Sequence, residues 1–245
     1  MSSPFPLRIA LWSGPRNIST ALMYSFAQRP DIKVFDEPLY AHYLHHSNAK
    51  NYHPGAEEII QSQNTDGEKV VQNIFLNNNS SPLIFIKSMT HHLINLDWSF
   101  LKNMVNVILT RDPVEMLPSL AVNIKSPTIL DTGYLHQIKL LEYLTQNKQY
   151  PPILDAKQVL LNPKLVLSKL CARLDIAFNC NMLKWEAKPR KEDGIWAKYW
   201  YKNIHNSTGF VEYTPKTEPF PDHLIPLLKE CEPFYKKLNE LAIKA

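Results

Sequence analysis

The stretch LRIALWSGPRNIST, residues 7–20, contains the pattern that decides the fold. Its first part, Leu7–Trp12, is an apolar run interrupted only by Arg8, which is typical of a parallel strand covered on both faces. A short polar loop follows, and the apolar periodicity after Thr20 indicates a helix. A strand, a tight loop and a helix in this order predict the first unit of an α/β domain.

The same alternation of strand and helix recurs along the chain. Four further apolar runs are expected strands: Ile32–Phe35, Leu83–Ile86, Val105–Leu109 and Pro152–Leu154. The segments with helical periodicity are Asn17–Gln28, parts of 56–78, Pro113–Val122, Tyr134–Asn147 and Pro163–Leu174. We therefore predict a three-layer α/β fold around a doubly wound parallel sheet, with its ligands beyond the carboxyl ends of the strands.

The chain is expected to form a single domain over residues 1–245, because it contains no repeat, low-complexity tract or linker. Residues 184–217 are rich in lysine, tryptophan and tyrosine without a clear period, and we interpret them as a long covering segment. A last helical pattern spans residues 222–243.

Composition excludes several classes of function. The chain has 6 glycines against 19 prolines, and contains neither a G-x-G-x-x-G fingerprint nor a G-x-x-x-x-G-K-[ST] loop. A net charge of +4 is too small to indicate nucleic acid but fits an anionic ligand. The three cysteines form no C-x-x-C pair, and no apolar leader or membrane-length apolar stretch is present. We therefore expect a cytoplasmic protein without a membrane or nucleic-acid partner.

The loop after the first strand has the properties of an anion site. A helix that begins inside it directs free N–H groups and the positive end of its dipole toward the loop. Arg16 adds a guanidinium suited to phosphate or sulfate, and Ser19 and Thr20 add hydroxyls. Because Ile18 adopts positive φ only at a cost, we expect helical φ/ψ there. The alternative is a tight turn in which serine caps the helix.

The loop after the fourth expected strand has a second such arrangement. Asp112, Pro113 and Glu115 form a helix start, with an N-cap, an N1 proline and an acid three residues after the cap. Arg111 thus stands at the corner between strand and helix, and Ser119 lies two turns into the helix. The alternative is that Arg111 only caps a neighbouring helix.

The two loops together resemble those of P-loop sulfotransferases, and the resemblance spans nearly the whole chain, best in residues 7–125 and 150–178. That family holds the 5′-phosphosulfate of PAPS with a Pro-Lys-Ser-Gly-Thr-Thr-type loop, which PRNIST at 15–20 matches position by position. Asn17 replaces a serine and Ile18 a glycine. The resemblance implies the P-loop nucleotide-binding type of fold, and its implied binding residues are Arg16, Asn17, Ile18, Ser19 and Thr20.

The resemblance also implies a site for the 3′-phosphate. The family clamps this group with an arginine and a serine eight residues apart, the spacing of Arg111 and Ser119. A later Arg-Lys-Gly…Gly-Asp-Trp stretch of the family is similar, with altered spacing, to PRKEDGIW at 189–196. Arg190 and Lys191 are therefore expected to contact the 3′-phosphate, unless they belong to a solvated charged face.

Sulfuryl transfer needs a base and positive groups around the transferred oxygens. Glu37 follows the second expected strand, where some sulfotransferases carry a base glutamate, and it is our first choice; Asp36 is the alternative, and either could instead be held in a structural salt bridge. Lys87 occupies the place of the lysine that touches the bridging oxygen in cytosolic family members. His91 is a second candidate base, although it stands four residues after that lysine instead of two.

The resemblance implies a PAPS-dependent sulfotransferase that transfers a sulfuryl group to a hydroxyl or amine of a small-molecule acceptor, releases PAP and requires no metal. Trp196 or Trp200 is expected to stack on adenine. Four histidines after the second strand lie among tyrosines and match no standard metal set, so we interpret them as an aromatic acceptor mouth.

Two alternatives stay open. A P-loop small-molecule kinase is disfavoured because Ile18 occupies the place of the Walker lysine, and no Walker B aspartate is evident. A nucleotide-binding protein without catalysis is the second alternative. The acceptor's identity and the oligomeric state cannot be derived from the residues.

Overall fold

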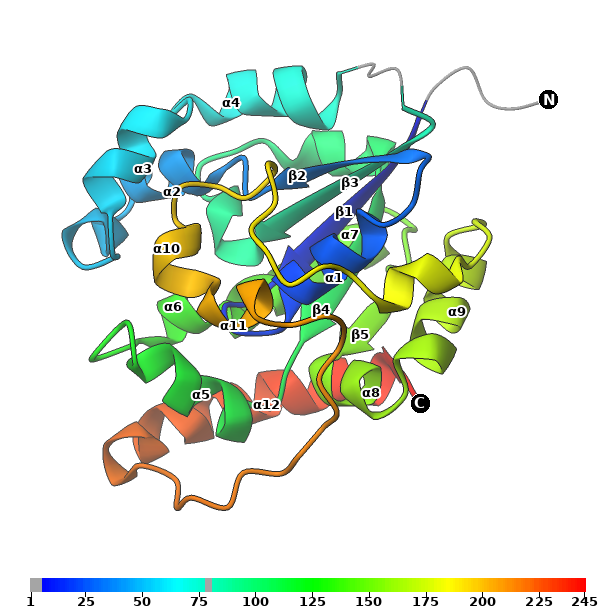
Figure 1. Ribbon diagram of the computed structural model, residues 1–245. Helices are drawn as coiled ribbons and strands as arrows, with labels where there is room; N and C mark the ends of the chain where they lie inside the picture. Colours follow the sequence, from blue (N-terminus) through cyan, green and yellow to red (C-terminus); the bar gives the residue numbers. More distant parts are fainter. Residues whose placement is uncertain (1–5, 78–80) are drawn as a thin grey trace.

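A six-stranded sheet forms the centre of the computed structural model, which describes residues 6–77 and 81–245 (Figure 1). All pairs are parallel and the strand order is β2-β3-β1-β4-β5-β6. The strands are β1 Leu7–Ser13, β2 Ile32–Asp36, β3 Leu83–Met89, β4 Val105–Thr110, β5 Ile153–Asp155 and β6 Ala242–Ile243. The predicted doubly wound parallel α/β fold is confirmed.

Helices cover both faces of the sheet, as the apolar runs predicted. Alternate strand residues point to opposite sides: Trp12 and Ile108 pack with α5, α7 and α12, whereas Leu11 and Val107 pack with α1, α8 and α9. The helices are α1 Ser19–Phe26, α2 Tyr40–His46, α3 Ala56–Ser62, α4 Gly67–Val70, α5 Pro113–Ala121, α6 Ile129–Thr132, α7 Tyr134–Gln146, α8 Ala156–Leu161, α9 Pro163–Arg173, α10 Ala197–Trp200, α11 Lys202–His205 and α12 Ile225–Leu241.

Two predicted helical segments differ from the structure. The pattern at 222–243 begins with a 3₁₀ turn, continues as α12 and ends at Leu241, after which Ala242 pairs with Ile153 as the edge strand β6. The pattern within 56–78 divides into α3, α4 and a π turn, Val71–Phe75. In both cases the apolar periodicity was visible but the breaks within it were not.

The order of the strands places a crevice beside β1. The chain leaves β1 for β2 and β3 on one side and later builds β4 and β5 on the other, so the loops after β1 and β4 diverge at the carboxyl edge. The covering segment, with α10 and α11, lies across this edge (Figure 1). Among the residues that the structure describes, no helix combines the length and apolarity needed to cross a membrane.

Candidate active site

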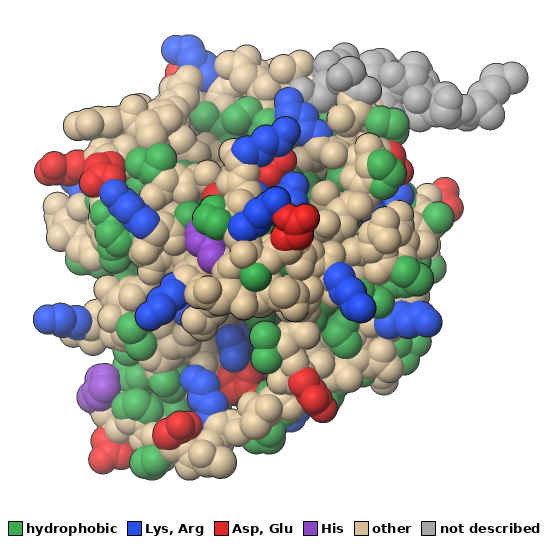
Figure 2. All heavy atoms as spheres, viewed as in Figure 1, with side chains coloured by type: hydrophobic (Ala, Val, Ile, Leu, Met, Phe, Trp, Pro, Cys, Tyr) green, Lys and Arg blue, Asp and Glu red, His purple; other side chains and the backbone are tan. Residues whose placement is uncertain are grey.

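A cavity of about 480 Å³ opens at the carboxyl edge of the sheet. The loops after β1, β2, β3 and β4 line it together with parts of the covering segment from Trp200 to Lys216. Figure 2 shows a hollow on this face between α5 and α11, with lysine or arginine atoms inside it. The sequence-predicted residues that line the cavity are Arg16, Asn17, Ile18, Ser19, Thr20, Glu37, Lys87, His91, Arg111 and Ser119.

The loop after β1 has a left-handed backbone at two residues, Arg16 with φ 58° and Ile18 with φ 61°. The expectation of helical φ/ψ at Ile18 is therefore wrong: Ile18 is the N-cap of α1, and the helix begins at Ser19. Its side chain packs at the edge of the core between α1 and the sheet, which helps to offset the conformational cost. The turn leaves the first N–H groups of α1 at the cavity.

Three cations gather at one end of the cavity. The Arg16 guanidinium donates to Ser119 Oγ at 2.9 Å, and Arg111 Nη1 donates to the Arg16 carbonyl at 2.8 Å. Burial and the Arg111 charge lower the pKa of Arg16, and burial, with Arg111 and Arg16 adding to it, lowers the pKa of Lys216. Glu115 pairs with Arg111 at 3.3 Å. The three cations still exceed the carboxylates near them, Glu115 and Glu218, which leaves this end suited to an anion.

Arg111 braces the loop after β1 in this structure, because its Nη1 binds the loop carbonyl of Arg16. The predicted helix start after it is confirmed, since Asp112 accepts from Val114 N at 2.9 Å with Pro113 at the first helical position. Lys216 was not predicted. It lies in irregular chain far from the motifs, and its Nζ donates to the Glu115 carbonyl at 3.0 Å.

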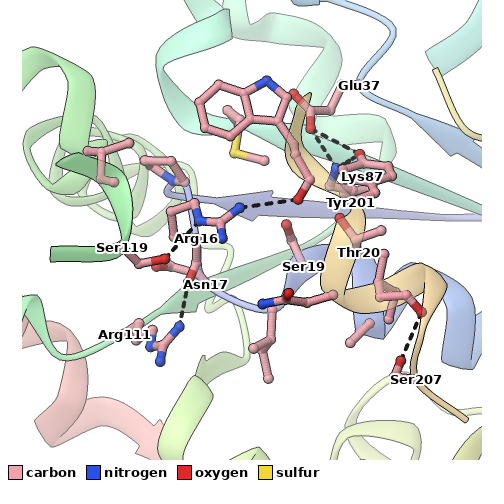
Figure 3. Close-up of a pocket in the computed structure, with 18 of the residues that line it drawn as sticks. Arg16, Asn17, Ser19, Thr20, Glu37, Lys87, Arg111, Ser119, Tyr201 and Ser207 are labelled. Carbon is pink, nitrogen blue, oxygen red and sulfur yellow. Dashed lines mark hydrogen bonds and ion pairs between the residues drawn. The ribbon is translucent and has the colours of Figure 1, made fainter. Parts of the chain in front are cut away.

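A buried ionic cluster occupies the opposite end (Figure 3). Lys87 Nζ lies 2.8 Å from Asp36 Oδ1, 2.5 Å from Glu37 Oε1 and 2.5 Å from the Tyr201 hydroxyl. Burial disfavours the Lys87 ammonium, but the two carboxylates outweigh it and raise the pKa of Lys87. Lys87 is therefore a fixed positive charge. In Figure 3, Ser19 and Thr20 lie between this cluster and the group of Arg111 and Ser119.

The two carboxylates of the cluster differ in how many of their oxygens accept hydrogen bonds. Asp36 accepts from Lys87, from the Tyr201 hydroxyl at 2.8 and 2.9 Å and from Gly194 N at 3.2 Å, so both its oxygens are occupied. Glu37 lines the cavity, and its Oε2 lies 4.0 Å from His92 Nε2. Burial and the neighbouring Asp36 raise the pKa of Glu37, against the effect of Lys87. Glu37 has one carboxylate oxygen without a hydrogen bond from a described residue, whereas both oxygens of Asp36 accept hydrogen bonds.

The histidines of the cavity are held neutral. Burial lowers the pKa of His91 and of His92 well below the ordinary value, and it lowers the pKa of His53 to about 4. The Tyr40 hydroxyl and His53 Nδ1 are 2.9 Å apart. Of the four histidines that follow β2, which are His42, His45, His46 and His53, only His53 lines the cavity. Within residues 6–77 and 81–245 no three potential ligands form a metal site.

The structure does not bring Arg190 and Lys191 to the cavity. Arg190 pairs with Glu192 at 3.1 Å and lies 5.7 Å from the centre of the Tyr24 ring, and Lys191 is exposed. Of the two tryptophans considered for adenine, Trp200 lines the cavity, whereas Trp196 is buried at 2% exposure.

These features define a parallel α/β protein in which a helix N-terminus with nearby arginines shares one cavity with a buried lysine–carboxylate cluster. The family model described as a sulfotransferase domain matches residues 7–242. The chain therefore belongs to the sulfotransferase domain family. The family resemblance predicted from its two loops is thereby confirmed.

Two Arabidopsis thaliana proteins, the branched-chain-amino-acid aminotransferase-like proteins 2 and 1, are 38% identical over 232 residues and 37% identical over 237 residues. The matches cover 94% and 96% of this chain but 41% and 42% of the relatives. The chain thus spans about two-fifths of their length.

Two solved structures show the same fold at low sequence identity. The sulfotransferase domain from the curacin biosynthetic pathway has a TM-score of 0.54 at 16% identity, covering 94% of this chain and 99% of that one. A sulfotransferase from Alicyclobacillus acidocaldarius has a TM-score of 0.56 at 13% identity, covering 99% and 98%. The P-loop type of fold predicted from the loops is thereby confirmed.

Proposed function

We propose that this chain transfers a sulfuryl group from PAPS to a hydroxyl or amine of a small-molecule acceptor and releases PAP. The observation that carries the proposal is that one cavity joins an anion-binding end to a buried lysine–carboxylate cluster. Membership of the sulfotransferase family supports it.

The anion-binding end suits the donor nucleotide. The N–H groups and hydroxyls of Ser19 and Thr20 are available to the 5′-phosphosulfate at the start of α1. Arg111, Ser119 and Lys216 would hold the 3′-phosphate, in place of the pair Arg190 and Lys191. The like-charge crowding at this end favours such a ligand, because a bound phosphate relieves the repulsion between the cations.

The cluster end suits the chemistry of transfer. Glu37 Oε2 accepts the proton of the acceptor hydroxyl or amine while a bond forms between the acceptor atom and sulfur. The bond from sulfur to the oxygen of the 5′-phosphate breaks, and its electron pair leaves with PAP. Lys87 stays protonated and stabilises the charge that develops on this oxygen. His91, neutral and on the cavity wall, is the second candidate for the base.

Calorimetry of nucleotide binding tests the donor. We expect PAP to bind the purified chain without metal and more tightly than ATP with magnesium. A preference for magnesium ATP would instead support the kinase alternative. Binding of PAP without any turnover of labelled PAPS over a broad acceptor panel would support the inactive nucleotide-binding alternative.

Replacing Glu37 tests the base. We expect Glu37→Gln to lower kcat by about 10² to 10⁴ with little change in PAP affinity, because the amide cannot take the proton. Glu58→Gln is the control, since Glu58 is an exposed carboxylate paired with Lys198. Wild-type activity should fall as the pH drops through the raised pKa of Glu37, because the protonated carboxyl cannot accept a proton. Full activity of Glu37→Gln would exclude Glu37 as the base.

A further inference from the structure

The charged residues that line the cavity are divided by sign. Arg111 and Lys216 lie at the donor end, and the Arg16 guanidinium extends from Ser119 Oγ there, at 2.9 Å, to the Trp200 carbonyl, at 3.2 Å. At the other end the single cation, Lys87, is already bound by two carboxylates. A further carboxylate, that of Asp131, lines the cavity, and no step of the proposed sulfuryl transfer uses it. The end that must receive the acceptor therefore has an excess of negative charge.

Asp131 is a buried carboxylate, 4% exposed, without a positive partner. Its Oδ1 accepts from the Tyr52 hydroxyl at 2.6 Å, and its Oδ2 accepts from the backbone and the hydroxyl of Thr128, both at 2.7 Å. In the described part of the chain no ion pair joins it to a lysine, arginine or histidine. Buried carboxylates are ordinarily paired, because neutral donors alone only partly replace their hydration.

Aromatic rings lie near both Asp131 and Glu37, the proposed base. Asp131 raises the pKa of His53 without overcoming its burial, so His53 is close to Asp131 and uncharged at neutral pH. The His53 ring is 5.9 Å from that of Tyr40 and 6.3 Å from that of Trp200, and Tyr40 in turn senses the charge of Glu37. The rings of Tyr40, His53 and Trp200 all line the cavity. Aromatic faces attract organic cations.

We propose that the acceptor carries an ammonium group, which pairs with Asp131 beside these rings while a hydroxyl of the same molecule meets Glu37. This inference rests on the proposed sulfuryl transfer and names its substrate class: small hydroxylated amines, including quaternary ones. The ammonium group neutralises the charge that the chain leaves uncompensated at Asp131. An anionic acceptor would meet the carboxylates of Glu37 and Asp131, while the one ammonium at this end, that of Lys87, is already bound by Asp36 and Glu37.

Binding of matched ligands to the PAP-loaded chain tests the substrate class. The pairs are tyramine with its neutral isostere 4-propylphenol, and choline with 3,3-dimethylbutan-1-ol; 4-hydroxyphenylacetate is the anionic probe. In calorimetry we expect the ammonium member of a pair to bind about tenfold tighter or more, the usual size of a charge-assisted contact. We expect the anion to bind weakest.

Asp131→Asn should reduce this preference to about threefold or less without changing PAP affinity. Asp155→Asn is the matched control, because Asp155 is also a buried aspartate at a helix N-terminus, accepting from Gln158 N, but lies outside the cavity. It should keep the full preference. Thermal unfolding of both variants separates loss of the charge from loss of the fold.

Three results would overturn the proposal. They are equal binding of charged and neutral members by the wild type, failure of both ammonium ligands to bind, and equal loss of preference in Asp155→Asn and Asp131→Asn. The comparison of ammonium and neutral ligands on the wild type tests the proposal even if Asp131→Asn does not fold. If PAP itself fails to bind, the proposed function fails, and the same ligands titrated into the free chain still measure the ammonium preference separately.

Discussion

At the scale of single residues, three of the six non-glycine residues with positive φ in the described part of the chain line the cavity. Arg16, Ile18 and Glu37 all have left-handed φ angles, of 58°, 61° and 41°, and all three line the cavity. Each such residue other than glycine costs about 1–2 kcal/mol. The strain at Glu37 directly follows β2, where its N–H donates to the Lys87 carbonyl at 2.8 Å. The chain thus accepts unfavourable conformations where its backbone turns functional groups toward the cavity.

The conformation of Ile18 predicts an inverted response to substitution. Glycine normally destabilises relative to alanine by about 0.5–1 kcal/mol, but at positive φ alanine carries a steric penalty that glycine avoids. We therefore expect Ile18→Gly to be more stable than Ile18→Ala, by about 1 kcal/mol, in urea unfolding. The same comparison at Ala21, inside α1, should give the ordinary order. If Ile18→Ala proved the more stable, the left-handed turn would not be present in solution.

At the scale of elements, the covering segment supplies one wall of the cavity. Its apolar and aromatic residues were visible in the sequence, but its irregular backbone gives no period from which to predict which side chains face inward. Arg190 consequently looked suitable for a phosphate but pairs with Glu192, while Lys216 reaches the cavity from the coil after α11. Positions next to regular elements were predicted better: Arg111 reaches the cavity because it directly follows the buried strand β4.

Lys216 should therefore report on the 3′-phosphate. We expect Lys216→Ala to weaken PAP by about tenfold or more and to weaken adenosine 5′-phosphosulfate, which lacks the 3′-phosphate, much less. Lys191→Ala, at an exposed lysine outside the cavity, is the control and should leave PAP affinity unchanged. Equal losses for both nucleotides would place Lys216 elsewhere on the donor. A loss in Lys191→Ala instead would restore the role first expected from the sequence.

At the scale of the whole molecule, the fold was predictable because five strands are largely apolar runs, most of them covered on both faces of the sheet. The two-residue strand β6 and the short helices α2, α6 and α8 have too few residues for a period and were missed. Residues from both the predicted and the missed elements line the cavity. Glu37, directly after β2, and Lys87, near the end of β3, were predicted, whereas Asp131 in α6 and Tyr201 after α10 reach the cavity through tertiary packing that local patterns do not encode.

This packing also buries several histidines, which makes stability depend on pH. Burial lowers the pKa of His53 to about 4, and those of His91 and His92 well below the ordinary value. Because the folded-state pKa values lie below that of an unfolded histidine, about 6.5, the unfolded chain binds more protons as the pH falls. The stability that these groups contribute is therefore complete above about pH 6.5 and is lost below it.

We expect the free energy of unfolding in urea to fall by about 1 kcal/mol per buried histidine over the first pH unit below 6.5. The raised pKa of Glu37 acts in the opposite sense, because its protonation in the folded state stabilises the fold as the pH drops. The variant His53→Gln separates the histidine contribution from that of Glu37. It should reduce the fall of the free energy of unfolding with pH by about the contribution of one histidine, whereas His45→Gln, at an exposed position, should leave this fall unchanged. A wild-type stability that stays constant from pH 7 to pH 5, with the same curve in His53→Gln, would mean that His53 is solvated in solution. The aromatic wall that the ammonium proposal requires would then be absent as well.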